Sequence, residues 1–285
     1  MTYHRTDTNR GRIVPLLDGI MELDPLSTFP GLSADDWNGH EQFLSRSGAL
    51  SMPYGGFLVE SSPGSNVLVD VGGGPMFDVP PDKGSLAMAG RLPEALFDLG
   101  VERTSIRAVL LTHLHVDHIG WLAPEGEPFF PNATIYCHQE DWSYFVDVVD
   151  SPDIRIPNLI AGCEDRFQLW SGSSMTIEDL VMRHTPGHTP GSSVVMVGAP
   201  DSAVLVGDLV HSPVEFLHRW NGLADVDSVM AAKTRTEFKN ELLATRNMVW
   251  GPHFPSMAPG KLRDASPAGI TIWDPCCTPE SGSDH

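Results

Sequence analysis

The sequence predicts an α/β sandwich, in which two β-sheets pack face to face and helices cover their outer faces. Short runs rich in β-branched residues, bounded by Gly, Pro, Ser and Asn, outnumber the helical patterns along the 285 residues. Strands and helices are also mixed in both halves of the chain, which favours layered sheets with helices outside. We find no internal repeat and no interdomain linker. We therefore expect residues 1–285 to form one domain.

The first half of the chain is expected to be mainly strand. Pro93 stands in the first turn of a predicted helix, and Gly100 ends it. Residues 24–53 show no periodicity and are expected to form an irregular N-terminal arm. The predicted strands cover residues 12–23, 56–60, 66–71, 106–112 and 134–137, and the predicted helices cover residues 93–99 and 139–149.

The second half repeats this mixture. Its strands are predicted over residues 176–183, 192–197, 203–206 and 247–250, and its one helix over residues 226–245. From about residue 266 the chain is rich in Pro, Ser and Asp, so we expect a loosely held C-terminal tail.

Composition excludes some classes of partner. The chain has 18 basic and 37 acidic residues and a formal charge of -19, and its basic residues are scattered, so we expect no nucleic acid partner. No apolar stretch is long enough to cross a bilayer, so we expect no membrane partner. The polar start of the chain lacks a secretory signal, and we expect a cytoplasmic protein. The residues leave the oligomeric state open, including a homodimer.

Four residues that can bind metals occur within six positions. The segment from Leu111 reads LTHLHVDHIGW, which contains His113, His115, Asp117 and His118. A strand has a side-chain period of two, so a strand ending just before His113 would project His113 and His115 to one side. Asp117 and His118 would lie in the turn that opens a helix. Neutral imidazole and carboxylate suit zinc or another first-row divalent metal.

Three more candidate ligands follow predicted strands. His188 lies in the loop HTPGHTPGS, Asp208 follows AVLVG, and His253 follows MVWGP. Binding and catalytic side chains often lie on loops that a rigid framework of strands holds in place, so these positions fit a functional site.

Seven ligands are too many for one tetrahedral zinc and are enough for two metal ions. We expect His113, His115 and His188 on one metal, Asp117, His118 and His253 on the other, and Asp208 with a water between them. Zinc is the favoured metal, with manganese or iron as alternatives. Two such cations lower the pKa of bound water and provide hydroxide near pH 7.

THLHVDH, TPGHTPGS and the strand-terminal Gly-Asp resemble the motifs of the metallo-β-lactamase fold superfamily, in the same order and over about residues 13–253. The resemblance implies an αββα sandwich with the metals at one edge between the sheets. It also implies that all seven residues are metal ligands.

The bridging position holds Asp208 instead of the Cys of a major class of true β-lactamases. The spacing of the later ligands is similar to that in the N-acyl-homoserine lactonase and methyl parathion hydrolase groups. It is 70 residues from His118 to His188, 20 from His188 to Asp208 and 45 from Asp208 to His253.

We therefore expect a dinuclear metal-dependent hydrolase whose metal-bridging hydroxide opens an ester or lactone of a small, apolar molecule. Asp117 is the expected catalytic residue, steering the hydroxide and passing a proton to the leaving oxygen. The alternatives are a phosphotriesterase with the same metals, a persulfide dioxygenase with a single iron, and a non-catalytic binding module.

Apolar residues on two segments are candidates for the wall of a substrate pocket, with ordinary packing as the alternative. They are Phe29, Trp37, Phe43, Met52, Phe216 and Trp220. His138 and His184 could orient a ligand, although a plain surface or core role is favoured, and His211 is expected near the rim of the site.

Overall fold

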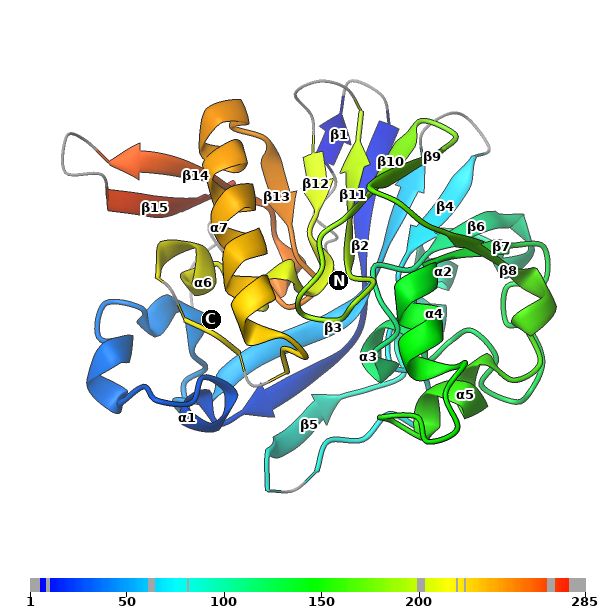
Figure 1. The fold of residues 1–285 in the computed structure, drawn as a ribbon, viewed down its shortest axis with the longest axis horizontal. Coiled ribbons are helices and arrows are strands. Elements are labelled where there is room, and N and C mark those ends of the chain that lie inside the picture. Colours follow the sequence, from blue (N-terminus) through cyan, green and yellow to red (C-terminus); the bar gives the residue numbers. More distant parts are fainter. Residues whose placement is uncertain are drawn as a thin grey trace, which may run out of the picture.

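Two sheets lie face to face with helices outside them in the computed structural model of this chain, as Figure 1 shows. The structure describes residues 6–8, 11–60, 65–80, 82–198, 203–218, 220–222, 224–265 and 270–276. This arrangement confirms the predicted sandwich, with the layer order helix, sheet, sheet, helix.

The first sheet has eight strands, antiparallel on one side and parallel on the other. In spatial order they are β1 (Thr6–Thr8), β2 (Gly11–Leu23), β3 (Leu50–Glu60), β4 (Asn66–Val69), β6 (Ile106–Leu110), β7 (Thr134–His138) and β8 (Phe167–Trp170), and β5 (Gly84–Met88) pairs with β2. The parallel pairs are β4–β6, β6–β7 and β7–β8.

The second sheet has seven strands. In spatial order they are β15 (Ile270–Pro275), β14 (Gly260–Ala265), β13 (Met248–Trp250), β12 (Ala203–Leu205), β11 (Ser193–Val197), β10 (Leu180–His184) and β9 (Ser174–Ile177). Among its described strands, only β12 and β13 pair in parallel. Consequently the chain leaves both strands at the same edge of this sheet.

Most helices are short, and the longest, α7, begins where the Asp227 carboxylate accepts the N–H groups of Val229 and Met230. The helices are α1 (Pro25–Thr28), α2 (Leu92–Asp98), α3 (Val116–Ile119), α4 (Gln139–Phe145), α5 (Arg155–Ile160), α6 (Val214–Leu217) and α7 (Ser228–Thr245). The 3₁₀ turns are η1 (Ala34–Trp37), η2 (Glu41–Phe43), η3 (Arg103–Ser105), η4 (Glu164–Arg166), η5 (Gly207–Leu209) and η6 (Pro255–Met257). None of the described helices combines the length and hydropathy needed to cross a membrane.

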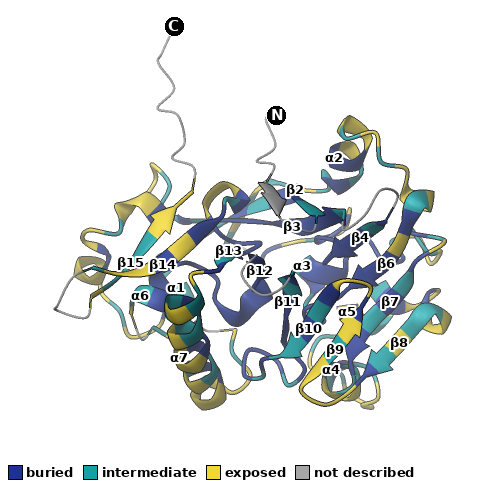
Figure 2. Ribbon diagram, turned by 90° about the horizontal axis from the view of Figure 1, so that it is seen from above, coloured by how far each residue is buried: buried dark blue, intermediate teal, exposed yellow. Residues whose placement is uncertain are grey.

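Three apolar layers follow from this order. Between the sheets, Phe57 and Leu110 of the first sheet pack with Met182 and Trp250 of the second. One further cluster packs α2, α4 and α5 onto the first sheet, and another packs α6 and α7 onto the second. Figure 2 shows the result, with buried strands in the middle and exposed residues on the outer faces of the helices.

Several predicted elements differ from the structure. The helix predicted over residues 139–149 ends at Phe145, and the strand predicted over residues 56–60 is the end of β3, which begins at Leu50.

Residues 176–183 are not one strand: β9 and β10 form a hairpin that turns at Glu178, whose φ is 53°. The turn was not predicted because residues that favour strands stand on both sides of it. β6 ends at Leu110, two residues before the predicted end, so His113 lies on irregular backbone.

The two terminal segments also contain structure. Residues 24–53, expected to be an irregular arm, contain α1, η1, η2 and the start of β3. Within the segment expected to be a loose tail, β15 pairs with β14 along its whole length. Residues 266–269 and 277–285 lie outside the described residues.

A buried carboxylate anchors the loop that lies beneath the metal-competent residues. Asp18, in β2, accepts the N–H groups of Gly73 (2.9 Å), Gly74 (3.1 Å) and Leu92 (2.8 Å) and the indole N–H of Trp121 (2.9 Å). Gly120, which ends α3, lies so close to this loop that a Cβ atom on it would meet the Gly73 carbonyl at 1.9 Å. The packing therefore positions α3 against the first sheet.

Replacing Asp18 by Asn is expected to lower the free energy of unfolding by about 3 kcal/mol. A carboxamide turns an N–H₂ group toward N–H donors and leaves buried donors unsatisfied. Urea unfolding measures the change. Asp227→Asn is the matched control, because Asn caps a helix as well as Asp does and should change stability by less than about 0.5 kcal/mol. Equal losses in the two variants would contradict this role for Asp18.

Candidate metal centre

Four side chains meet where β6, β10 and β12 end. His113 and His115 lie between β6 and α3, His188 lies between β10 and β11, and Asp208 lies in η5 directly after β12. His188 Nε2 is 3.3 Å from His113 Nε2 and 2.9 Å from His115 Nδ1. Asp208 Oδ2 is 3.4 Å from His188 Nε2 and 3.7 Å from His113 Nε2. We call these residues the first group.

A second group adjoins the first through the same carboxylate. Asp117 and His118 lie on α3, and His253 follows β13. Asp208 Oδ1 is 3.3 Å from the Nε2 atoms of both His118 and His253. Asp117 Oδ2 is 3.5 Å from His253 Nε2 and 3.8 Å from His118 Nε2. The structure thus brings all seven predicted residues together, and the two oxygens of Asp208 face different groups.

The donor atoms in both groups are spaced as metal ligands are. Ligand atoms at the corners of a zinc tetrahedron lie about 3.3–3.4 Å apart, because the Zn–N bond is about 2.0–2.1 Å. The distances within the two groups run from 2.9 to 3.8 Å. His118 Nε2 and Asp208 Oδ1 are buried and have no hydrogen-bond partner among the described residues. Both atoms are therefore available to a divalent cation.

Hydrogen bonds on the far side of three rings fix their orientation. His118 Nδ1 lies 2.9 Å from Asp70 Oδ2, and His253 Nδ1 lies 2.7 Å from the Pro53 carbonyl oxygen. His188 Nδ1 lies 3.3 Å from Asp225 Oδ1. A proton held at Nδ1 leaves the lone pair at Nε2, which is the arrangement of histidines that bind metals.

The electrostatics of the site also favour a cation. Burial lowers the pKa of His115 to about 3, and burial with the neighbouring His118 holds the pKa of His113 well below its usual range. Their imidazoles are therefore neutral. Burial opposes a charge on His118 too, but Asp208, Asp117 and Asp70 together hold its pKa well above its usual range. The carboxylates at the second group thus demand positive charge, which a metal ion can supply.

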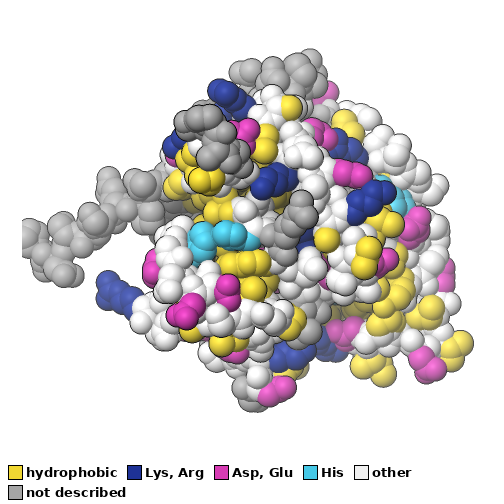
Figure 3. Space-filling model, turned by 60° about the vertical axis from the view of Figure 1, so that its left-hand side comes forward, with side chains coloured by type: hydrophobic (Ala, Val, Ile, Leu, Met, Phe, Trp, Pro, Cys, Tyr) yellow, Lys and Arg dark blue, Asp and Glu magenta, His cyan; other side chains and the backbone are white. Residues whose placement is uncertain are grey.

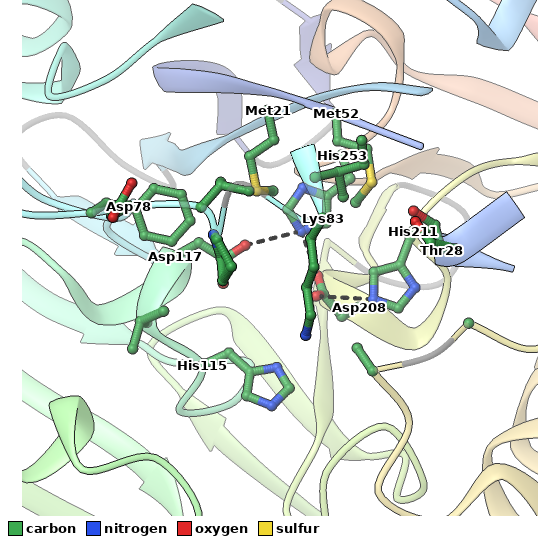
Figure 4. Close-up of a pocket in the computed structure, with 18 of the residues that line it drawn as sticks. Met21, Thr28, Met52, Asp78, Lys83, His115, Asp117, Asp208, His211 and His253 are labelled. Carbon is green, nitrogen blue, oxygen red and sulfur yellow. Dashed lines mark ion pairs between the residues drawn. The ribbon is translucent and has the colours of Figure 1, made fainter. Parts of the chain in front are cut away.

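A cavity of about 280 Å³ opens over both groups. In Figure 4, His115, Asp117, Asp208, His211 and His253 surround it. One wall is apolar and consists of Met21, Leu23, Met52, Phe77, Val79 and Pro80. Two cationic residues, Lys83 and Arg155, also line the cavity.

The predicted pocket wall was mostly wrong. Of its six residues, only Met52 lines this cavity. Phe29, Trp37 and Phe43 lie in the buried cluster behind the apolar wall, against which Trp220 packs. Phe216 belongs to the core beneath α7. These aromatic residues stabilise the N-terminal arm because the arm wraps around its own side chains.

The other histidines fall into two cases. His211, as expected, lies at the site: its Nε2 is 3.5 Å from Asp208 Oδ2, and its ring lines the cavity. His138 and His184 stack on each other with ring centroids 4.0 Å apart. Their Nε2 atoms face the carbonyl oxygens of Gly172 and Pro190, and with Glu140 they form a further group of metal-competent side chains that includes none of the seven residues.

Sequence reasoning missed the residues that hold the site from behind. Asp70 follows β4 as Asp208 follows β12, so the same signal of an acidic residue after an apolar strand was present in NVLVD. Asp70 also accepts the N–H (2.8 Å) and the hydroxyl (2.8 Å) of Thr112. Asp225, Glu215 and Arg235 carried no comparable signal.

Comparison with known proteins supplies a family. A family profile described as the metallo-beta-lactamase superfamily matches residues 56–246. The N-acyl homoserine lactonase AttM of Azorhizobium caulinodans is 28% identical over 135 residues, which are 43% of this chain and 47% of that protein. The chain therefore spans about half the length of this curated relative.

Two solved structures share the fold over nearly the whole chain. AidC, a dizinc quorum-quenching lactonase in complex with its product, has a TM-score of 0.82 at 21% identity and covers 97% of this chain and 98% of its own. AbOPH, a hydrolase of the beta lactamase superfamily, has a TM-score of 0.81 at 23% identity and covers 98% of each chain. At these identities the likeness establishes a common fold.

Zinc-loaded protein is expected to hold two metal ions per chain. Asp208→Ala should reduce the content below one, because both groups lose an oxygen, whereas His253→Ala should lower it to about one. Mass spectrometry of the metal after gel filtration measures this. His218→Ala, whose ring pairs with His40 and belongs to neither group, is the control and should retain both ions. If Asp208→Ala retained two ions, or His218→Ala lost one, the assignment would be wrong.

Proposed function

This chain belongs to the metallo-β-lactamase superfamily, and from that membership we propose that it is a dinuclear hydrolase that opens an ester or lactone of a small apolar molecule. Metal-dependent hydrolysis is the activity that the superfamily and the lactonase relative support. The two metals, their identity as zinc and the substrate are the proposed part.

The observation that carries the proposal is the position of the Asp208 carboxylate. Its Oδ2 lies by the histidines of the first group, and its Oδ1 lies 3.3 Å from both histidines of the second. A carboxylate shared in this way suits two cations with a small separation. Imidazole and carboxylate donors favour zinc, with manganese or iron as alternatives.

When bound, two such cations supply hydroxide near neutral pH and offset the charge that develops on a substrate oxygen. The side chains around the cavity transfer the proton and bind the substrate. Asp117 is the acidic residue of the second group, and it lines the cavity with a side chain that is 15% exposed. We assign to Asp117 the transfer of a proton to the leaving oxygen. His211 Nε2 faces the same space and can donate a hydrogen bond to the substrate.

The apolar wall of the cavity supports an apolar substituent on the substrate. Its thioether, aromatic and aliphatic side chains can pack against such a substituent, while Lys83 and Arg155 lie elsewhere in the lining. Because AttM and AidC are lactonases, we favour a lactone over a phosphotriester as the substrate.

A second cavity extends the apolar wall. It has a volume of about 270 Å³ and shares Phe77, Val116 and Arg155 with the first cavity. Sites for drug-sized ligands have volumes of about 300–1,000 Å³. The first cavity alone falls slightly below this range, whereas the two together lie within it. The substrate is therefore expected to carry a group that passes Phe77.

The function is tested by a substrate panel on zinc-loaded protein. We expect hydrolysis of medium-chain N-acyl lactones or aryl esters at a kcat/KM at least tenfold above that for paraoxon. Asp117→Asn should lower kcat by about 10²–10⁴-fold while most metal is retained. Faster turnover of paraoxon would favour a phosphotriesterase. Oxygen consumption with a persulfide in iron-loaded protein would favour the dioxygenase, and no turnover of any substrate would favour a binding module.

Phe77 is expected to set the length of the accepted chain. Phe77→Ala should raise kcat/KM for long acyl chains relative to short ones, because it widens the passage between the two cavities. Phe77→Trp should do the opposite. Steady-state kinetics over a series of acyl lengths measures the ratio. Phe97→Ala, at an exposed position on α2, is the control and should leave the ratio unchanged. An unchanged ratio in both Phe77 variants would exclude the second cavity from substrate binding.

A further inference from the structure

A buried arginine lies directly behind the metal centre. Arg235, on α7, is only 5% exposed. Figure 1 shows α7 alongside β11, β12 and β13 of the second sheet. A buried guanidinium group is costly unless carboxylates and acceptors surround it. The partners of Arg235 are two buried carboxylates and one backbone carbonyl, and each of them contacts or adjoins a residue of the site.

The first partner orients a residue of the first group. Arg235 Nη1 and Nη2 donate to the two oxygens of Asp225, at 2.8 and 2.6 Å. Asp225 Oδ1 in turn lies 3.3 Å from His188 Nδ1. Asp225 cannot rotate without losing both of its bonds to Arg235. The pair therefore fixes the His188 ring with Nε2 toward the first group.

The other partners hold the turn that carries Asp208 and His211. Arg235 Nε donates to the Leu209 carbonyl oxygen at 2.6 Å and lies 3.6 Å from Glu215 Oε1. Glu215 Oε2 accepts the backbone N–H groups of His211 (2.5 Å) and Ser212 (3.1 Å). The polypeptide from Asp208 to Ser212 is thus tied to the same guanidinium group as His188.

We propose that Arg235 is a positioning residue that holds His188 through Asp225 and the Asp208–His211 turn through Leu209 and Glu215. This inference rests on the proposed function, because it takes His188 and Asp208 as metal ligands. The two branches act differently. The Asp225 branch sets the affinity of the first group for metal, and the Glu215 branch sets the position of His211 against the substrate.

The charge balance explains why a cation is needed there. Asp208, Asp225 and Glu215 are buried carboxylates in one small region, with side chains that are 4%, 0% and 0% exposed. Among the described residues, Arg235 is the only Lys or Arg that forms ion pairs with Asp225 or Glu215. Without it, these two carboxylates would repel each other and Asp208. Arg235 therefore keeps both hydrogen-bonding branches in place.

Zinc titration of the metal-free protein against a chromophoric chelator tests the proposal without any substrate. Arg235→Gln and Asp225→Asn should weaken the binding of one of two zinc ions by about 10–100-fold. Glu215→Gln should change zinc affinity by less than about threefold and instead lower kcat on the best substrate of the panel. In Arg235→Ala, millimolar guanidinium chloride should restore part of the lost zinc affinity, since it refills the site between the carboxylates.

The matched control is Arg183→Gln. Arg183 also pairs with α7, at 2.8 Å from Glu241, and lies over the Phe238 ring, but it contacts none of the site residues. This variant should keep wild-type zinc affinity.

Wild-type zinc affinity in both Arg235→Gln and Asp225→Asn would overturn the proposal, and so would an equal loss of affinity in Arg183→Gln. If Arg235→Gln fails to fold, Asp225→Asn against Glu215→Gln decides, because equal effects on zinc in these two would contradict separate branches. If none of the substrates is hydrolysed although the variants change zinc affinity as expected, the proposed function is overturned and the positioning role of Arg235 is not.

Discussion

The buried carboxylate of Asp208 is the interaction on which the rest of this structure depends. It lies between two groups of donor atoms and directs one oxygen to each. Its position follows from the sheet: β12 and β13 run in parallel, so Asp208 and His253 leave the same edge. The segment after β6, in the opposite sheet, brings His113 and His115 to that edge from the other side. The sandwich thus places strand ends from two sheets around one point.

Such a concentration of polar groups is unfavourable unless something compensates for it. A buried group without a hydrogen-bond partner costs about 1–3 kcal/mol, and a charged one costs more. The fold responds with a layer of supporting residues, namely Asp70, Asp225 and Arg235, which satisfy the outward-facing atoms. The inward-facing atoms, such as His118 Nε2, remain for cations. On the face shown in Figure 3, acidic and basic side chains are interspersed.

Much of the site could be predicted from the sequence because its chemistry is carried by short segments. HxHxDH is contiguous, and Asp208 and His253 directly follow apolar strands. The supporting layer could not be predicted in the same way. Arg235 lies in the middle of a helix, 10 residues from Asp225 and 20 from Glu215, and nothing in the sequence states that these side chains meet. The prediction of the pocket wall failed for a related reason. Aromatic residues of the arm, such as Trp37, could pack inward or line a cavity, and only tertiary contacts decide which.

The central claim is that seven side chains hold two metal ions on either side of Asp208. Anomalous diffraction at the zinc edge from crystals of zinc-loaded protein tests it most directly. Two peaks are expected, about 3.5–4 Å apart, one beside His113, His115 and His188 and the other beside Asp117, His118 and His253. A single peak, or a peak beside His138 and His184 with none at Asp208, would contradict the account.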